Sequence, residues 1–132
     1  MRTRTKLLLA AGGIASAGAT VAGVAVAADP TDNVKAPYAQ AAVAVNTDGT
    51  ISRQTDTIDA VTKTATGRYC ITLAPGVEAA RSVPVATLHN GADWRSEIYV
   101  QHQHSSCADN AIRVTTGTNG AAKDQPFYVV IP

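Results

Sequence analysis

The sequence contains few of the residues on which enzyme and metal sites are usually built. It has two cysteines, one tryptophan and three histidines among 132 residues. It also lacks a Cys-x-x-Cys pair, a Gly-x-Ser-x-Gly sequence and a glycine-rich loop followed by Lys-Ser or Lys-Thr. These absences argue against a redox-active or metal-binding thiol pair, a serine hydrolase of that type and a P-loop enzyme. Glu78 and Glu97 are its only glutamates, which makes a carboxylate pair for glycoside hydrolysis unpersuasive.

Acidic residues are absent from the beginning of the chain. Arg2, Arg4 and Lys6 precede a run of apolar or small residues that extends to position 28, and the first acid is Asp29. A basic start, an apolar middle and a small-residue end are the three parts of a secretion signal. We therefore predict a signal peptide over residues 1–28.

The alternative interpretation of this run is a membrane anchor. About 20 apolar residues are enough to span a bilayer, but this run is mostly Ala and Gly, which insert weakly. No cysteine lies near the junction and no Arg-Arg pair precedes the run, so lipoprotein and twin-arginine signals are disfavoured. Cleavage after Ala27 or Ala28 would leave a secreted, extracellular protein without a membrane association.

Removal of the signal changes the net charge. The full chain carries +1, whereas eight basic and ten acidic residues remain after position 28, a net charge of about −2. Such a weak balance gives no electrostatic reason for binding to nucleic acid or to an anionic membrane.

The two cysteines, Cys70 and Cys107, predict a disulfide, because an even count in an exported chain favours pairing. The chain-entropy model gives about 4 kcal/mol for closing a loop of this length.

Short runs rich in Val, Ile, Thr and Tyr, separated by Gly, Pro, Asn and Asp, predict β-strands from residue 38 onward. The preceding polar segment, 29–37, is expected to be a flexible mature N-terminus. No amphipathic helix is indicated, and residues 78–81 can form at most one turn. The expected fold class is all-β: a single antiparallel β-sandwich, jelly-roll-like, over residues 38–132. About eight strands are expected, at residues 41–45, 51–54, 58–64, 68–73, 83–88, 97–104, 111–115 and 127–131.

Three strand details follow from single residues. Asp48-Gly49 between two such runs predicts a hairpin, with Gly49 at positive φ. Pro84 cannot donate to a ladder, so its strand is expected at a sheet edge or beginning after the proline. The last strand is apolar on both faces, which predicts a central, buried position.

Three landmarks resemble a known group of proteins. They are the hairpin at 44–50, the Gly-x-Tyr-Cys strand at 67–73 and the closing Phe-x-Val-x-Ile at 127–131. In this order they resemble small exported β-domains of high-GC Gram-positive bacteria, which are similar to phage-tail and collagen-like fibre heads. The resemblance implies a bacterial sandwich that can trimerise, and it brings no catalytic residues.

His102 and His104 are the strongest metal-ligand candidates, because residues i and i+2 of a strand share a face. His89 could supply a third ligand, with Asp93 or Asp109 as carboxylates. The alternative is a pair of exposed histidines at a strand end. Ser105 and Ser106 also follow His104, but adjacency in sequence is not the geometry of a catalytic triad.

Trp94 lies between two charged residues in a polar segment. Exposed, it would be a binding anchor for sugar or protein; buried, it would cap one end of the sandwich. The sequence favours a secreted, non-enzymatic module with an interaction or structural role at the cell exterior, and no cofactor is expected. The alternative is a small metal-binding protein or metal-dependent hydrolase that uses His102 and His104.

Overall fold

The structure, a computed structural model, describes residues 38–132. The predicted signal peptide (1–28) and mature N-terminus (29–37) lie outside the described residues. Residues 38–132 contain no helix long and apolar enough to cross a membrane. The elements are β1 (Ala41–Val45), β2 (Ile51–Gln54), β3 (Ile58–Ala65), β4 (Arg68–Leu73), a 3-10 turn η1 (Ala79–Arg81), β5 (Val85–Leu88), β6 (Ser96–His102), β7 (Ala111–Thr118), β8 (Ala121–Ala122) and β9 (Phe127–Ile131).

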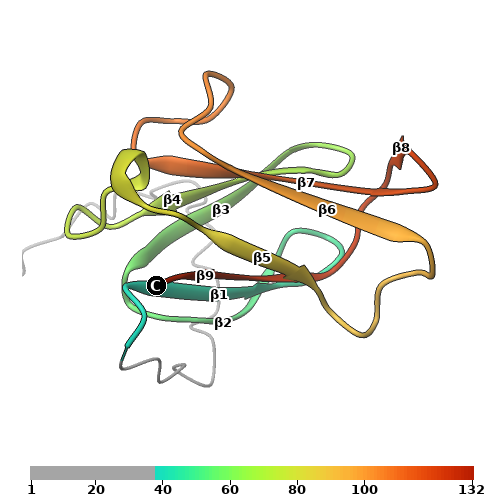
Figure 1. The fold of residues 1–132 in the computed structure, drawn as a ribbon, viewed down its shortest axis with the longest axis horizontal. Coiled ribbons are helices and arrows are strands. Elements are labelled where there is room, and N and C mark those ends of the chain that lie inside the picture. The colour runs from blue at the N-terminus through green and yellow to red at the C-terminus, as the bar shows by residue number, and fades with distance from the viewer. Residues whose placement is uncertain (1–37) are drawn as a thin grey trace, which may run out of the picture.

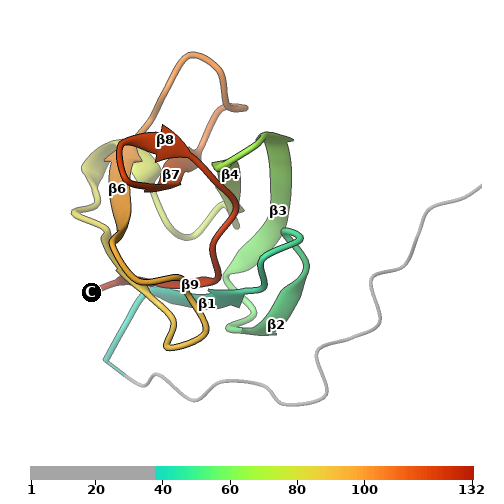
Figure 2. The ribbon, with the colours of Figure 1, turned by 90° about the vertical axis from the view of Figure 1, so that its right-hand side faces the viewer.

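Two antiparallel sheets form the two layers of a sandwich, as predicted (Figures 1 and 2). One sheet has the order β2-β1-β9-β5, and the other has the order β3-β4-β7-β6, with β8 paired to β7. Seen from the end in Figure 2, β1, β2 and β9 form the lower layer, and β3, β4, β7 and β6 curve above it. The ninth strand, β8, was not expected from the sequence, because two alanines carry no strand pattern.

The β1–β2 hairpin is confirmed, and its turn explains its sequence. Gly49 has φ +89°, a conformation that side chains disfavour. The N–H of Asn46 donates to the carbonyl of Thr50 at 2.8 Å, which closes the turn. The Asp48 carboxylate accepts bonds from the N–H of Thr50 at 2.9 Å and from its hydroxyl at 2.6 Å, which fix the loop.

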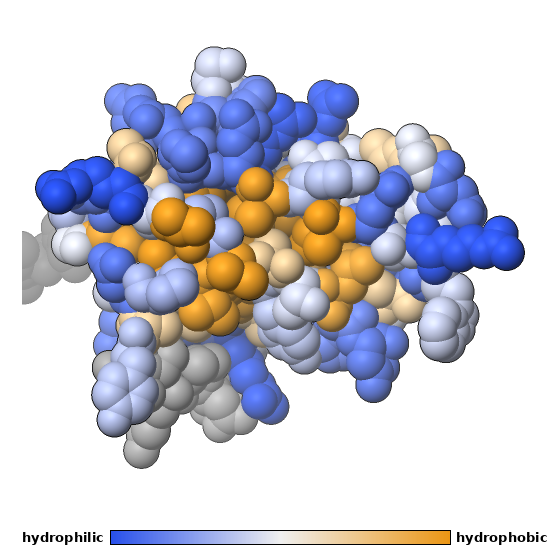
Figure 3. Space-filling model, viewed as in Figure 1, coloured by the Kyte–Doolittle hydropathy of each residue, from blue (hydrophilic) through white to orange (hydrophobic). Residues whose placement is uncertain are grey.

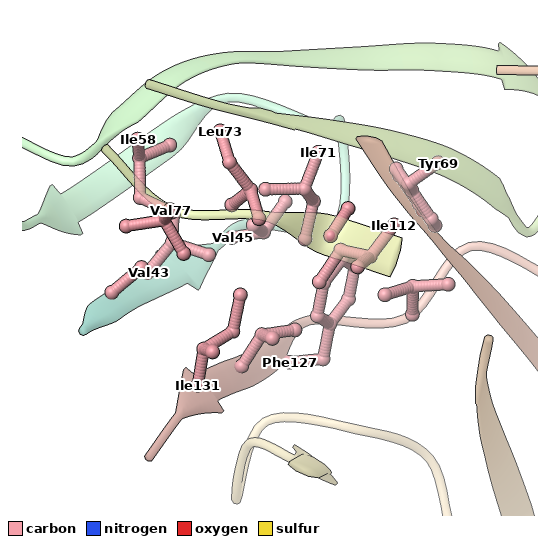
Figure 4. Packing of buried hydrophobic residues seen from close by; sticks show 14 residues of the cluster. Val43, Val45, Ile58, Tyr69, Ile71, Leu73, Val77, Ile112, Phe127 and Ile131 are labelled. Atoms are coloured by element: carbon pink, nitrogen blue, oxygen red, sulfur yellow. The ribbon is translucent and has the colours of Figure 1, made fainter. Parts of the chain in front are cut away.

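The core lies between the sheets and is built from alternate residues of each strand (Figure 4). On β4, the side chains of Tyr69, Ile71 and Leu73 are buried, in keeping with the two-residue period. The rings of Tyr69 and Phe127, from opposite sheets, meet edge to face with centroids 5.0 Å apart. Each such large side chain contributes about 1.5–3 kcal/mol when fully buried, so these contacts hold the two layers together.

The positions of β5 and β9 follow the prediction in part. β5 is an edge strand that begins directly after Pro84, and β9 is central. The prediction that β9 is buried on both faces is wrong: Tyr128 and Val130 are 40% and 39% exposed. These two side chains point away from the core, toward the outer face of the sheet, because they alternate with its buried residues.

Two predicted strand ends are also corrected. β6 ends at His102 rather than at residue 104, because Gln103 has φ +44°, which interrupts the extended backbone. β7 continues to Thr118, and the turn contains Asn119 and Gly120, both at positive φ. The strand predicted over 111–115 therefore ends three residues later than expected.

The predicted disulfide is confirmed. Cys70 and Cys107 are bonded, with Cα atoms 5.6 Å apart. Cys70 belongs to the outward face of β4, and Cys107 belongs to the loop between β6 and β7. The bond therefore ties this long loop to the outside of the second sheet.

The side of the sandwich formed by β5 and β6 carries exposed apolar groups. These edge strands belong to different sheets and lie side by side without pairing (Figure 1). Figure 3 shows apolar side chains gathered over both strands. Val83 and Val85 are exposed, and Ile98 and Val100 of β6 are only partly buried against the core.

Candidate binding surface

The three histidines named as metal ligands are not brought together. His89 follows β5 and packs its ring against Tyr128, with centroids 5.2 Å apart. His102 is at the other end of β6, the strand that begins after the His89 loop. In residues 38–132 no group of three or more His, Cys, Asp or Glu side chains is placed to hold a metal ion. The predicted site that combines His89 with the other two histidines, and with Asp93 or Asp109, is therefore not formed.

The expectation that His102 and His104 share a face is also wrong. The left-handed conformation of Gln103 separates the two residues. His102 pairs with Ile112 at the end of the sheet, whereas His104 contacts Arg113, the next residue of β7. The alternation of β6 therefore ends at His102 and does not place His104 on the same face.

His104 does meet Ser106, but without the third partner of a triad. The Ser106 hydroxyl lies 2.8 Å from Nδ1 of His104, and the Ser106 N–H donates to the same nitrogen at 3.1 Å. The Arg113 guanidinium lies 2.6 Å from Nε2. A triad needs a carboxylate there, because the imidazole must become positively charged when it accepts the serine proton. A guanidinium opposes that charge, so this arrangement disfavours nucleophilic catalysis.

Trp94 is 94% exposed, so the interpretation that it caps the sandwich is wrong. It lies in the loop between β5 and β6, residues 89–95, which we call the Trp94 loop. The next residue, Arg95, has φ +64°, an uncommon conformation for a residue with a side chain. In Figure 1 this loop projects at the lower right, toward the same end of the molecule as the β1–β2 turn.

A network around buried Gln125 fixes the Trp94 loop. The Gln125 side chain accepts a bond from the N–H of Asp93 at 3.1 Å and donates to the Asp93 carboxylate at 2.9 Å. It also donates to the hydroxyl of Thr118 at 2.8 Å. The N–H of His89 donates to the carbonyl of Pro126 at 2.9 Å, which ties the start of the loop to the segment before β9. Trp94 is therefore exposed on a loop that these hydrogen bonds hold in place.

Asp93 is further held by an ion pair with Lys123, at 2.6 Å. The hydrogen bond from Lys123, followed by the one from Gln125, lowers the pKa of the Asp93 carboxyl. The carboxylate therefore stays ionised, and both of its partners remain engaged, over the whole neutral range.

A groove of about 790 Å³ lies beside the Trp94 loop, between it and the β1–β2 turn. Its aromatic side is formed by His89 and Tyr128. Its polar side is formed by Asn46, Asp48 and Arg53. Among the described residues, the Arg53 guanidinium makes no ion pair and no hydrogen bond.

The sequence did not single out this groove, because its residues are far apart in the chain. Pairing of β1 with both β2 and β9 sets Ala44 between Arg53 and Tyr128. The sequence gives no signal for the outward position of Tyr128, because the strand is apolar at every position and only its burial alternates. Alternation alone does not identify which outward residues from different strands become neighbours.

No protein-family model, curated protein or solved structure was found to match this chain.

Proposed function

We propose that this protein is a secreted, non-enzymatic binding module that acts at the cell exterior, and that Trp94 is its principal contact residue. The observation that carries the proposal is the exposed indole of Trp94 on a loop fixed by hydrogen bonds to Gln125. An exposed indole offers a partner a large apolar surface together with one hydrogen-bond donor. Tryptophan is also the residue type most enriched among residues that dominate binding energy.

Two further observations support an exterior location. The chain begins with the basic, apolar and small-residue regions of a secretion signal. The Cys70–Cys107 disulfide is of the kind that persists in oxidising compartments. Trp94 also needs no reorganisation before binding, because its loop is already fixed, and this lowers the entropic cost of association.

A sedimentation experiment with intact Gram-positive cells and their isolated cell walls tests the proposal. Trp94 is the only tryptophan, so its fluorescence emission reports directly on burial of this residue. We expect the protein to sediment with cells or walls, with a blue-shifted emission. Trp94→Ala should weaken binding at least about tenfold, as a dominant contact does, whereas Trp94→Phe should weaken it less.

Exposed Tyr99 on β6 provides the matched control, since Tyr99→Ala removes an exposed aromatic group that lies outside the Trp94 loop. Binding that is unchanged in Trp94→Ala, or absent from cells and walls alike, would overturn the proposal.

A second candidate function, a structural module that assembles from copies of itself, is favoured by the apolar side of β5. Val83 and Val85 are exposed there, the latter at 57%, and the resemblance to fibre heads implies trimers. Light scattering would give three times the chain mass for this function, and Val85→Lys should then return the protein to a monomer. A monomer in the unsubstituted protein would remove this candidate.

A further inference from the structure

We infer that the groove between the β1–β2 turn and the Trp94 loop binds carbohydrate. This inference rests on the proposed function and adds a ligand site beside the Trp94 loop, lined by His89 and Gly91 of that loop and not by Trp94 itself. The groove has the volume of a small-molecule site, about 790 Å³ against a usual range of roughly 300–1,000 Å³. It is also an open groove rather than an enclosed cavity, which suits a chain of sugar units that enters and leaves along the surface.

The aromatic side of the groove offers a surface for a sugar ring. Tyr128 is 40% exposed, and His89 packs against it at an interplanar angle of 58°. One face of a pyranose ring presents mainly C–H groups, which pack on the electron-rich face of an aromatic ring. The backbone of Tyr128 is fixed because β9 is paired on both sides, and the His89 ring packs against the phenol, which reduces the entropy lost when a sugar covers it.

The polar side of the groove offers planar groups of both hydrogen-bonding kinds. Arg53 supplies donors that are free among the described residues. Asp48 supplies an acceptor: Thr50 occupies only its Oδ1 atom, and these bonds lower the pKa of the carboxyl. Adjacent sugar hydroxyls donate and accept at once, and they pair with a carboxylate and a guanidinium in this way.

His89 adds a donor of defined orientation. The N–H of Gly91 donates to Nδ1 of His89 at 2.9 Å. A neutral imidazole whose Nδ1 accepts a bond carries its proton on Nε2, so that nitrogen is a donor. The bond also fixes the ring beside Tyr128, and the aromatic side is therefore already arranged before a ligand arrives.

Other ligand classes fit the groove less well. A polyanion such as nucleic acid would find one free guanidinium and would be repelled by Asp48 and by the mature net charge. An apolar peptide would leave the charged groups of Asp48 and Arg53 without partners, which is costly. A neutral sugar satisfies both polar groups and covers the aromatic rings.

A nuclear magnetic resonance titration of the ¹⁵N-labelled protein tests this inference. The probes are tetrasaccharides of β-1,4-linked glucose, N-acetylglucosamine, mannose and xylose, and of α-1,4-linked glucose. At least one should give saturable shifts at the amides of residues 46–50, 53, 89–91 and 128. Tyr128→Ala and Arg53→Met should each weaken binding at least about tenfold, while Tyr128→Phe should retain it within about threefold.

Tyr99→Ala is the control and should leave the affinity unchanged, because that tyrosine lies on the other sheet. Arg53 is exposed, so its substitution tests binding without disturbing the core.

Three results would overturn the carbohydrate inference. They are the absence of shifts with all five sugars, shifts centred on Tyr99, and full affinity in both Tyr128→Ala and Arg53→Met. If no sugar causes shifts while cell binding still depends on Trp94, only this inference fails. If a sugar binds in the groove while cell binding is unchanged in Trp94→Ala, the proposed function fails and the carbohydrate inference stands.

Discussion

At the scale of single residues, Gly67 is the position where the backbone tolerates least change. It has φ +65°, and a Cβ atom placed there would lie 2.3 Å from the carbonyl oxygen of Thr116. We expect Gly67→Ala to lower the free energy of unfolding by about 2–4 kcal/mol, because it combines left-handed strain with a backbone clash. Urea unfolding measures this change.

Gly76→Ala provides the matched control for this substitution. Nothing lies within 4 Å of a Cβ atom at Gly76, and its φ is not positive. Its effect should stay within about 0.5 kcal/mol, as for surface substitutions in general. Equal unfolding midpoints for the two variants would contradict the strain assigned to Gly67.

The buried hydroxyl of Tyr69 makes stability depend on alkaline pH. Burial, and then the negative charge of Asp124, raises the pKa of Tyr69 to about 12 from its ordinary value of 10.0. The unfolded chain therefore loses this proton first, so its stabilising contribution is complete below pH 10 and disappears as the pH rises toward 12. The loss is on the order of 2 kcal/mol.

Unfolding experiments at successive alkaline pH values measure this loss. Tyr69→Phe keeps the ring against Phe127 and removes the titrating group, so its stability should fall less steeply over the same interval. Parallel curves for the two proteins would show that other groups control the alkaline transition.

At the scale of elements, the sequence predicted strands wherever runs rich in Val, Ile, Thr and Tyr were bounded by turn residues. The bounds of β4 and β9 are as predicted, because buried Tyr, Ile, Leu, Phe and Val occupy every second position. The end of β6 was missed because Gln103 adopts positive φ without being glycine, and the end of β7 was missed because the strand continues through Gly117 to the turn at Asn119. Such conformations depend on tertiary contacts: the N–H of Asn119, for example, donates to the carbonyl of Arg95 at 3.2 Å.

Of the candidate binding surface, the sequence predicted only the tryptophan. The composition draws attention to Trp94 as a single large aromatic residue, but its exposure depends on Gln125, which lies far along the chain. Gln125 is 2% exposed, and no local pattern marks it as a buried polar residue. The groove likewise depends on strand pairing that joins Arg53 to Tyr128 through β1.

The Gln125 network predicts how the Trp94 loop responds to substitution. Gln125→Ala removes the bonds to Asp93 and Thr118, so we expect a loss of about 2–3 kcal/mol and a looser loop. Hydrogen exchange at the amides of Asp93 and Ser96 should accelerate at least about tenfold relative to amides of β4, because local opening becomes easier.

Gln101 on β6 is exposed and serves as the control, since Gln101→Ala should alter neither the exchange at Asp93 nor the stability by more than about 0.5 kcal/mol. Unchanged exchange at Asp93 in Gln125→Ala would mean that Lys123 and the backbone bonds brace the loop without Gln125.

At the scale of the whole molecule, the disulfide offsets the small size of the core. A domain of about a hundred residues buries only about 60–70% of its unfolded surface, so its net stability is modest. Cys70–Cys107 joins the long loop after β6 to β4. No side chain of that loop belongs to the core cluster. The loop is fixed by this bond at Cys107 and, at its other end, by Asn110, whose side-chain amide donates to the carbonyls of Leu73 and Val77.

The double variant Cys70→Ala with Cys107→Ala should therefore fold but lose about 2–4 kcal/mol in urea unfolding. Reduction of the unsubstituted protein should give the same loss, and its mass should rise by two hydrogen atoms. Because the Tyr69–Phe127 contact lies on the opposite face of β4 from Cys70, the core should remain packed in both cases. A mass that does not change on reduction would contradict the bond. Loss of all cooperative unfolding in the double variant would show instead that the loop contributes to the core.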